Sequence, residues 1–341
     1  MPNTETKVHF VKKVRKIMKP KMWAYMIHLG SNMWYKKGME VPWLGKLDDE
    51  QPIYHDYLNC DKKIWREITD FLPTCGINTL LIDMGEGVIL DSHPELAIPG
   101  SWTKEEFREE LARLRSIGLT PIPKFNFSAG HNAWLQDYAY MIGTDLHNQV
   151  CMDVIEETIE LFDTPEFFHL GLEEEDPINQ GGQPVSIMRA PNRKTSDALL
   201  LFDVCRKHGV RPWIWLDYKG VKEFGGEEAF RANIPHDVLI SNFVYRMLWD
   251  HPEEFERKPD MQLYRQLDEW GYEQIPTVST YESQLNPKQT MKLFKKYQNS
   301  DLVTGFMTAS WGATVPKRYY YLLNDAFVFG NAKKDIFPEC E

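Results

Sequence analysis

The sequence predicts a single (β/α)8 barrel, the TIM-barrel class of α/β fold. Eight strand-like runs alternate with amphipathic segments of helical period from residue 22 almost to the end of the 341-residue chain. No GxGxxG, GxxxxGKS or GxxxxGKT motif follows these runs, which disfavours a doubly wound sheet with a nucleotide site. No low-complexity linker or composition shift divides the chain. We therefore predict an N-terminal arm or helix over 1–20 and one barrel domain over 21–335.

Each predicted strand is a short apolar run rich in β-branched, aromatic or aliphatic residues. The predicted strands are 22–29, 78–83, 120–126, 166–172, 211–217, 238–244, 273–280 and 302–309. The predicted helices are 60–73, 103–117, 147–162, 195–208, 260–270, 287–298 and 317–328. Thr103 and Glu106 have the spacing of a capping box, which starts a helix. Gly118 and Gly209 each stand just before a predicted strand, where a glycine commonly ends a helix.

The charge and the aromatic content limit the classes of partner. The net charge is −11 and the pI is about 5.5, which argues against nucleic acid or an anionic membrane surface as a partner. No run reaches the roughly 20 apolar residues of a membrane span. The chain holds 11 Trp, and indole rings either fill a core or pack against the apolar faces of sugar rings. A carbohydrate is therefore compatible with this composition.

Neither the cysteines nor the histidines indicate a metal or another cofactor. The five cysteines are scattered and odd in number, with no CxxC spacing: Cys60, Cys75, Cys151, Cys205 and Cys340. No HxH or HExxH motif occurs, so we predict no metal and no cofactor. The N-terminus has no continuous apolar run of signal-peptide type. We expect a cytoplasmic protein as the sequence is written, or a periplasmic or secreted one if a signal peptide has been removed; the sequence does not indicate an oligomeric state.

The segment 166–177, EFFHLGLEEEDP, carries the strongest chemical signal. An apolar run ends abruptly in Glu173, Glu174, Glu175 and Asp176. Carboxylates crowded at the end of a buried strand raise one another's pKa, and this is how a protein keeps a general acid protonated near neutral pH. The alternative for such a cluster is a solvated acidic turn.

Polar and aromatic side chains follow the other predicted strands as well. In a (β/α)8 barrel, the chemistry lies at the carboxyl ends of the strands. The residues at these ends include Asp83, Asn126, His131, Trp134, Glu173, Glu174, Trp215, Asp217, Tyr245, Tyr281, Glu282 and Trp311. Carboxylates, one histidine, an amide and aromatic rings at one mouth predict a pocket that binds and cleaves a sugar.

Three motifs on successive strands carry a resemblance to a known family. They are NTLLID at 78–83, the run at 93–134 that contains PIPKFNFSAGHNAW, and HLGLEE at 169–174. In this order they resemble the catalytic barrel of the family 20 glycoside hydrolases, the β-N-acetylhexosaminidases. The resemblance covers about residues 78–175, and Trp311 further resembles a tryptophan of the family's eighth strand.

The resemblance implies roles for several of these residues. Glu174 would be the general acid/base, and Glu173 would orient the 2-acetamido group of the substrate, which itself attacks the anomeric carbon. His131 and Asp83 would form a relay behind Glu174. The other predicted residues would contact the substrate: Asn126, Trp134, Trp215, Asp217, Tyr245, Tyr281, Glu282 and Trp311. Strict strand alternation would place residues 173 and 174 on opposite faces, so Glu174 reaches the pocket only if the strand gives way to a turn there.

The chain departs from the family at several positions, and these departures leave alternatives. The first strand lacks the family's arginine, Asn126 replaces an aspartate, and Glu173 replaces the aspartate that orients the acetamido group. We therefore expect an exo-acting glycosidase of a β-linked sugar that need not prefer N-acetylhexosamines. In one alternative, Glu174 or Glu175 is the acid and Glu282 is the nucleophile of a two-carboxylate retaining enzyme, about 5 Å apart. In another, the barrel binds a sugar without cleaving it.

Overall fold

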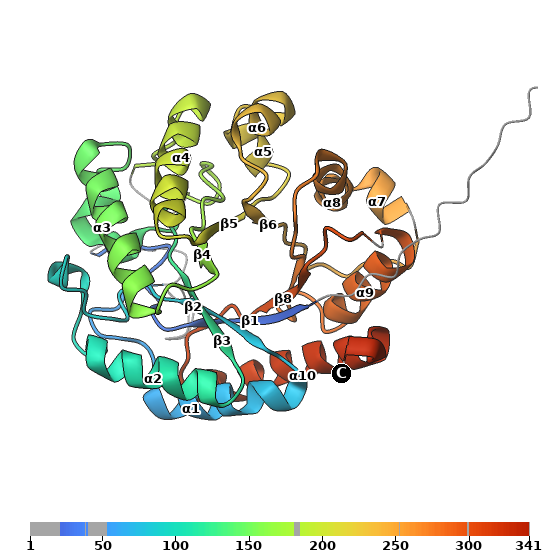
Figure 1. Ribbon diagram of the computed structural model, residues 1–341, viewed down its shortest axis with the longest axis horizontal. Coiled ribbons are helices and arrows are strands. Elements are labelled where there is room, and N and C mark those ends of the chain that lie inside the picture. The colour runs from blue at the N-terminus through green and yellow to red at the C-terminus, as the bar shows by residue number, and fades with distance from the viewer. Residues whose placement is uncertain are drawn as a thin grey trace, which may run out of the picture.

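The computed structural model describes residues 21–340 except residues 38, 40–52, 181–184, 252 and 299. The arm predicted over 1–20 lies outside the described residues. Eight parallel strands form one sheet (Figure 1): β1 (Met22–His28), β2 (Thr79–Asp83), β3 (Thr120–Lys124), β4 (Phe167–His169), β5 (Arg211–Trp215), β6 (Leu239–Ser241), β7 (Thr277–Val278) and β8 (Gly305–Ala309). The predicted (β/α)8 barrel is thus confirmed, and every strand falls within its predicted range.

The sheet closes on itself. The hydrogen-bonded order is β6-β5-β4-β3-β2-β1-β8-β7. Two single bridges, Ile240 to Gln274 and Phe243 to Thr277, then join β6 to β7. Because all strands are parallel, their carboxyl ends meet at one mouth, where a (β/α)8 barrel places its functional side chains.

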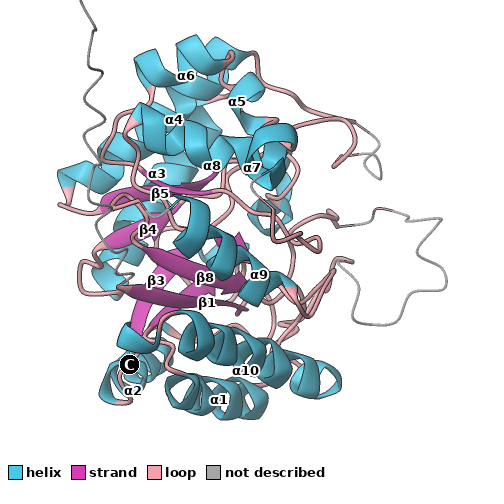
Figure 2. Cartoon of the chain, turned by 90° about the vertical axis from the view of Figure 1, so that its right-hand side faces the viewer, coloured by secondary structure: helices cyan, strands magenta, loops and turns pink. Residues whose placement is uncertain are grey.

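The helices surround the strands (Figures 1 and 2). Those that match the prediction are α1 (Lys62–Phe71), α2 (Lys104–Ser116), α3 (Asp145–Leu161), α4 (Pro191–Lys207), α8 (Pro259–Trp270), α9 (Asn286–Leu293) and α10 (Tyr319–Ile336). Three short helices were not predicted, since they are too brief to show a helical period: α5 (Gly220–Glu223), α6 (Glu227–Asn233) and α7 (Glu253–Arg257). No described helix has the length and hydropathy needed to cross a membrane.

Local signals read from the sequence appear in the structure. The Thr103 hydroxyl accepts from the Glu106 amide at 3.2 Å, and the Glu106 carboxylate accepts from the Thr103 amide at 3.0 Å, which is a complete capping box at the start of α2. Gly118 and Gly209 have φ angles of 89° and 75° after α2 and α4. These left-handed conformations end the two helices and turn the chain into the next strand.

Alternation along each strand divides the core into two layers. In β1, Trp23, Tyr25 and Ile27 pack outward against the helices, whereas Ala24 and Met26 fill the barrel interior with side chains such as Leu81, Ile122, Trp213 and Met307. His28 is two residues beyond Met26 and lies on the same face. The last residue of β1 therefore lies on the interior face, at the barrel mouth.

Candidate functional site

A cavity of about 520 Å³ opens at the carboxyl ends of the strands. Its size falls within the roughly 300–1,000 Å³ of small-molecule sites. The residues that line it are His28, Ser31, Trp34, Asn59, His131, Glu173, Glu174, Asn179, Trp215, Phe243, Tyr245, Tyr281, Trp311, Gly312, Ala313 and Arg318. A larger depression of about 890 Å³ is lined by residues of α3, α4 and α6 and the adjoining segments, and therefore lies on the outer surface. Of these two cavities in the described part of the chain, the one at the mouth gathers the residues expected at the strand ends.

A left-handed turn after β4 brings two adjacent acids into this cavity. The strand ends at His169, and Gly171, Leu172 and Glu174 have φ angles of 71°, 73° and 57°. A left-handed conformation costs an ordinary residue roughly 1–2 kcal/mol, so the surroundings must hold this turn. The turn breaks the strand alternation, and both Glu173 and Glu174 consequently line the cavity. The sequence analysis required such a turn for Glu174 to reach the pocket.

Gly171 is required by a close approach as well as by its φ angle. A Cβ atom there would lie 2.2 Å from the Asn126 side-chain oxygen. That oxygen accepts from the Ser128 hydroxyl at 2.6 Å and from the Ser128 amide at 3.1 Å. The segment after β3 and the turn after β4 are therefore packed directly on each other, and the family-like motifs of the two strands form one unit.

Glu173 is buried at the wall of the cavity. One carboxylate oxygen accepts from the Asn126 amide nitrogen at 2.8 Å. The other, Oε2, has no hydrogen-bond partner among the described residues. Burial raises the pKa of Glu173, while the nearby charges of His131 and Lys124 act in the opposite direction. Glu173 thus offers one acceptor atom to a ligand that can donate a hydrogen bond.

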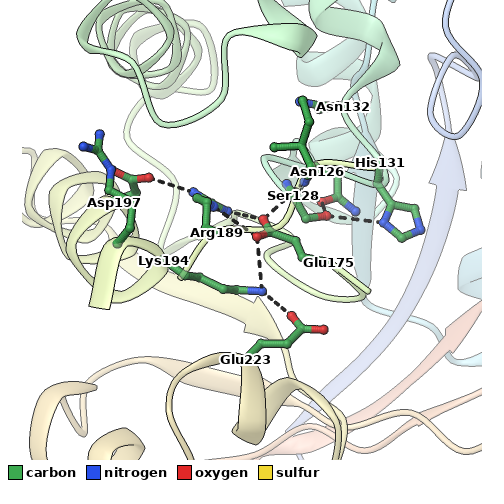
Figure 3. Close-up of polar contacts among 12 residues, drawn as sticks. Asn126, Ser128, His131, Asn132, Glu175, Arg189, Lys194, Asp197 and Glu223 are labelled. Atoms are coloured by element: carbon green, nitrogen blue, oxygen red, sulfur yellow. Dashed lines mark hydrogen bonds and ion pairs between the residues drawn. The ribbon is translucent and has the colours of Figure 1, made fainter. Parts of the chain in front are cut away.

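His131 connects the two loops at the acid. Its Nε2 lies 3.4 Å from Glu174 Oε2. Its Nδ1 lies 3.3 Å from the Ser128 hydroxyl oxygen (Figure 3). Burial alone would lower the pKa of His131, but the hydrogen bond with Glu174 and the charges of Glu173 and Glu174 raise it overall. The imidazole can therefore stabilise a negative charge on the Glu174 carboxylate.

Asp83 does not form the predicted relay with His131. Its Oδ2 accepts from Lys124 Nζ at 2.7 Å and lies 3.3 Å from His28 Nδ1. Burial opposes ionisation of Asp83, but Lys124 and His28 outweigh it and lower its pKa to about 2. The register explains this outcome, because Asp83 lies directly beside His28 on one side and Lys124 on the other. The predicted relay is therefore wrong in its Asp83 part. His131 pairs with Glu174, and Asp83 belongs to a separate buried cluster with Lys124 and His28.

Aromatic rings form much of the cavity wall. The ring centroid of Trp311 lies 6.0 Å from that of Trp34, 6.4 Å from that of Trp215 and 6.2 Å from that of Tyr245. Tyr281 also lines the cavity, with a largely exposed side chain. The sequence pointed to Trp215, Tyr245, Tyr281 and Trp311 at the mouth, and it missed Trp34.

Four predicted contact residues lie outside the described lining of the cavity. Trp134 packs in the core, its ring centroid 4.6 Å from that of Phe125. Asn126 lies behind Glu173, as described above. Asp217 is buried and accepts from the Gly220 amide at 2.6 Å; burial, with the charge of Glu174 as a further contribution, raises its pKa to about 6. Glu282 is exposed to solvent and is not in the lining, and its role as nucleophile in the two-carboxylate alternative stays a prediction.

His28 is a cavity residue that the sequence analysis missed. Its Nδ1 faces Asp83, and its Nε2 is buried with no hydrogen-bond partner among the described residues. The Trp215 indole nitrogen, a donor, is likewise buried and unpartnered. Unpaired buried polar atoms are costly, so their concentration at one cavity indicates a polar ligand. Strand alternation from Ala24 and Met26 would have identified His28.

The described part of the chain contains no group of three or more His, Cys, Asp or Glu side chains placed to hold a metal ion.

The comparisons with known proteins support the fold. No protein-family model matches the chain, and no curated protein sequence matches it. Among solved structures, a β-N-acetylhexosaminidase from Bacteroides fragilis has a TM-score of 0.57 at 13% identity, covering 92% of this chain and 66% of its own. The chain therefore has a barrel fold similar to that of this protein.

Two further solved structures agree. An inactive mutant of the family 20 exo-β-N-acetylglucosaminidase from Vibrio harveyi has a TM-score of 0.60 at 12% identity, covering 91% of this chain and 53% of its own. A mutant β-hexosaminidase from Streptomyces plicatus, in complex with its product GlcNAc, has a TM-score of 0.55 at 13% identity, covering 90% of this chain and 63% of its own. The chain thus spans between about half and two thirds of the length of these three proteins.

Proposed function

We propose that the chain is a glycoside hydrolase that removes a terminal β-linked sugar, with Glu174 as the general acid/base. One observation carries the proposal: the turn after β4 places Glu173 and Glu174 side by side in a cavity where His131 reaches Glu174. The family 20-like fold of the barrel supports the same reaction class.

The exposure of the acid supports its role in proton transfer. The Glu174 side chain is 28% exposed, so it can reach both a bound substrate and water. In the first step the Glu174 proton moves to the glycosidic oxygen, and the carbonyl oxygen of the 2-acetamido group attacks the anomeric carbon. The bond to the leaving group breaks, and its electron pair stays on the oxygen that has taken the proton. The products of this step are an alcohol and a cyclic oxazolinium ion.

Glu173 is the residue we assign to the acetamido group. Its free Oε2 can accept the acetamido N–H, while Asn126 holds the other carboxylate oxygen at 2.8 Å. A negative charge beside the acetamido nitrogen stabilises the positive charge that develops there as the oxygen attacks. The substrate would also satisfy the buried acceptor that the protein leaves unpaired.

In the second step the ionised Glu174 acts as the base. It takes a proton from a water molecule that attacks the anomeric carbon, which opens the cyclic ion and returns the acetamido group with the β configuration retained. His131, whose pKa is raised, stabilises the Glu174 carboxylate between the two steps.

The aromatic wall supports a sugar as the ligand. Trp34, Trp215 and Trp311 offer flat apolar faces, and the acceptor of His28 and the donor of Trp215 can pair with hydroxyl groups, which both donate and accept. In the strand order, β1 and β4 are three strands apart. A sugar with its anomeric carbon at Glu174 would therefore point its far hydroxyls towards His28.

A panel of aryl β-glycosides, with and without N-acetyl groups, tests the proposal. The wild-type chain is expected to release the aryl group from at least one β-linked sugar, and Glu174→Gln is expected to abolish most of this activity. Binding of sugars without turnover of any glycoside would instead support a non-catalytic barrel. Activity that survives in Glu174→Gln and is lost in Glu282→Gln would support the two-carboxylate alternative.

A further inference from the structure

A buried ion-pair cluster surrounds the residue that follows the two acids in the sequence (Figure 3). Its centre is Glu175, which is 4% exposed and is the residue after Glu174. Arg189 Nε donates to Glu175 Oε2 at 3.0 Å, and a second guanidinium nitrogen of Arg189 contacts Glu175 Oε1. Lys194 Nζ lies 3.9 Å from Glu175 Oε2 and pairs with Glu223, and Arg189 also pairs with Asp197 of α4 at 3.2 Å.

Glu175 joins this cluster to the segment that carries His131. Its Oε1 accepts from the Ala129 amide at 3.2 Å. Ala129 lies between Ser128, which contacts His131 Nδ1, and Gly130, where a Cβ would come within 3.1 Å of the Glu174 carbonyl oxygen. One carboxylate thus fixes the segment after β3, the turn after β4 and the amino-terminal part of α4 relative to one another.

The cluster also accounts for the strained turn. Leu172 and Glu174 adopt left-handed conformations that disfavour ordinary residues, and such conformations persist only where the surroundings determine them. With a positive φ at residue 174, the side chains of 173 and 174 enter the cavity and that of 175 enters the cluster. Arg189 and Lys194 lower the pKa of Glu175 to about 2 even though burial opposes ionisation, so the anchor is charged throughout the neutral range.

We propose that Glu175, held by Arg189, is a positioning residue that sets the contact between Glu174 and His131. The effect on catalysis rests on the glycoside hydrolase function proposed above, whereas the effect on geometry does not. If the ion pair were released, the turn would relax and Glu174 would move away from His131. A misplacement of about 1 Å at a catalytic group can cost on the order of 10²-fold in rate.

Glu110→Gln provides a matched control for Glu175→Gln. Glu110 is a buried carboxylate on α2 that accepts from Arg113 Nε at 3.0 Å and from the Trp65 indole nitrogen at 2.8 Å. It belongs to the helix layer and does not line the mouth cavity. Both variants remove the charge of a buried glutamate that pairs with an arginine, so a difference between them reports the position of that glutamate in the fold.

The test follows the titration of the His131 imidazole by NMR in the wild type and in the Glu174→Gln, Glu175→Gln and Glu110→Gln variants. We expect the pKa of His131 to fall in Glu174→Gln and also in Glu175→Gln, and to stay at the wild-type value in Glu110→Gln. On aryl glycosides, Glu175→Gln is expected to lower kcat by on the order of 10-fold or more for poor leaving groups and by less for good ones.

A wild-type His131 titration in folded Glu175→Gln would overturn the positioning role, whatever the enzymatic activity. Absence of hydrolysis in the wild type would reject the proposed function, and the titration would still decide the positioning role. If Glu175→Gln does not fold, Arg189→Lys carries the same test, since it keeps both charges and loses the paired geometry of the guanidinium. If neither variant folds, the pair serves the fold itself and the proposal is rejected.

Discussion

The mouth of the barrel joins two sides of unlike construction. On the side of β3 and β4, the acids stand on a left-handed turn and are backed by buried charges. On the side of β8, β1 and β6, aromatic rings such as Trp311 and Tyr245 contact one another, and no described residue among 305–318 other than glycine has a positive φ angle. A left-handed conformation of an ordinary residue such as Glu174 persists where the surroundings determine it. The difference therefore separates the part we assign to bond cleavage from the part we assign to sugar recognition.

The largest expected effect is the loss of turnover when Glu174, on the acid side, is replaced. Glu174→Gln should lower turnover of poorly activated aryl glycosides by on the order of 10²-fold or more, the usual scale of general acid–base catalysis. Glycosides with good leaving groups should lose less in the first step, because they need no proton. Steady-state rates across a series of leaving groups measure this. Equal and slight losses for all leaving groups would mean that Glu174 is not the acid.

A smaller effect concerns the contribution of the buried Asp83 carboxylate to the stability of the fold. The pKa of Asp83, about 2, lies below its ordinary value, so its ionised form stabilises the fold above the ordinary pKa, and this contribution is lost as pH falls towards 2. Its size is on the order of 2 kcal/mol. Denaturant unfolding between pH 5 and pH 2.5 should show a steeper loss of the free energy of unfolding in the wild type than in Asp83→Asn. Equal slopes would show that Asp83 does not contribute to the acid sensitivity.

The smallest effect belongs to the aromatic side. Trp311→Ala should raise KM by on the order of 10-fold, which corresponds to about 1.4 kcal/mol of lost contact, and should change kcat much less than Glu174→Gln does. Trp311→Phe, which keeps an aromatic face, should lie between the wild type and the alanine variant. A loss confined to kcat would show that Trp311 acts in bond cleavage. It would contradict the assignment of the aromatic side to sugar binding.

The sequence predicted the barrel, and the placement of Glu173 and Glu174 at its mouth, because both depend on local signals. Eight short apolar runs were enough to place the strands, and the change from the apolar run to the acids at Glu173 marked the turn that follows β4, which itself ends at His169. The approach of His131 to Glu174 followed from a family resemblance on neighbouring strands. In each case the informative residues stand in one short segment or at matching strand ends.

Partners from other segments were not predictable in the same way. Lys124 takes Asp83 away from the expected relay, and this depends on the register of β2 against β3. Arg189, in the loop before α4, pairs with Glu175, which lies fourteen positions earlier in the sequence. No helical or strand periodicity relates the two residues, so the sequence does not indicate the pair. Trp134 has the spacing of a mouth residue, but its indole nitrogen donates to the Asn126 carbonyl at 2.9 Å and the ring fills the core.

The most direct test of the central claim is a comparison of two aryl β-glycosides that differ only in a 2-acetamido or a 2-hydroxyl group. If the acetamido group is the nucleophile and Glu173 orients it, wild-type kcat/KM should be at least on the order of 10²-fold higher for the acetamido substrate. Glu173→Gln should remove most of this preference, Glu282→Gln should keep it, and a thiazoline mimic of the cyclic intermediate should inhibit. Equal turnover of both substrates, with loss of activity only in Glu282→Gln, would contradict the account.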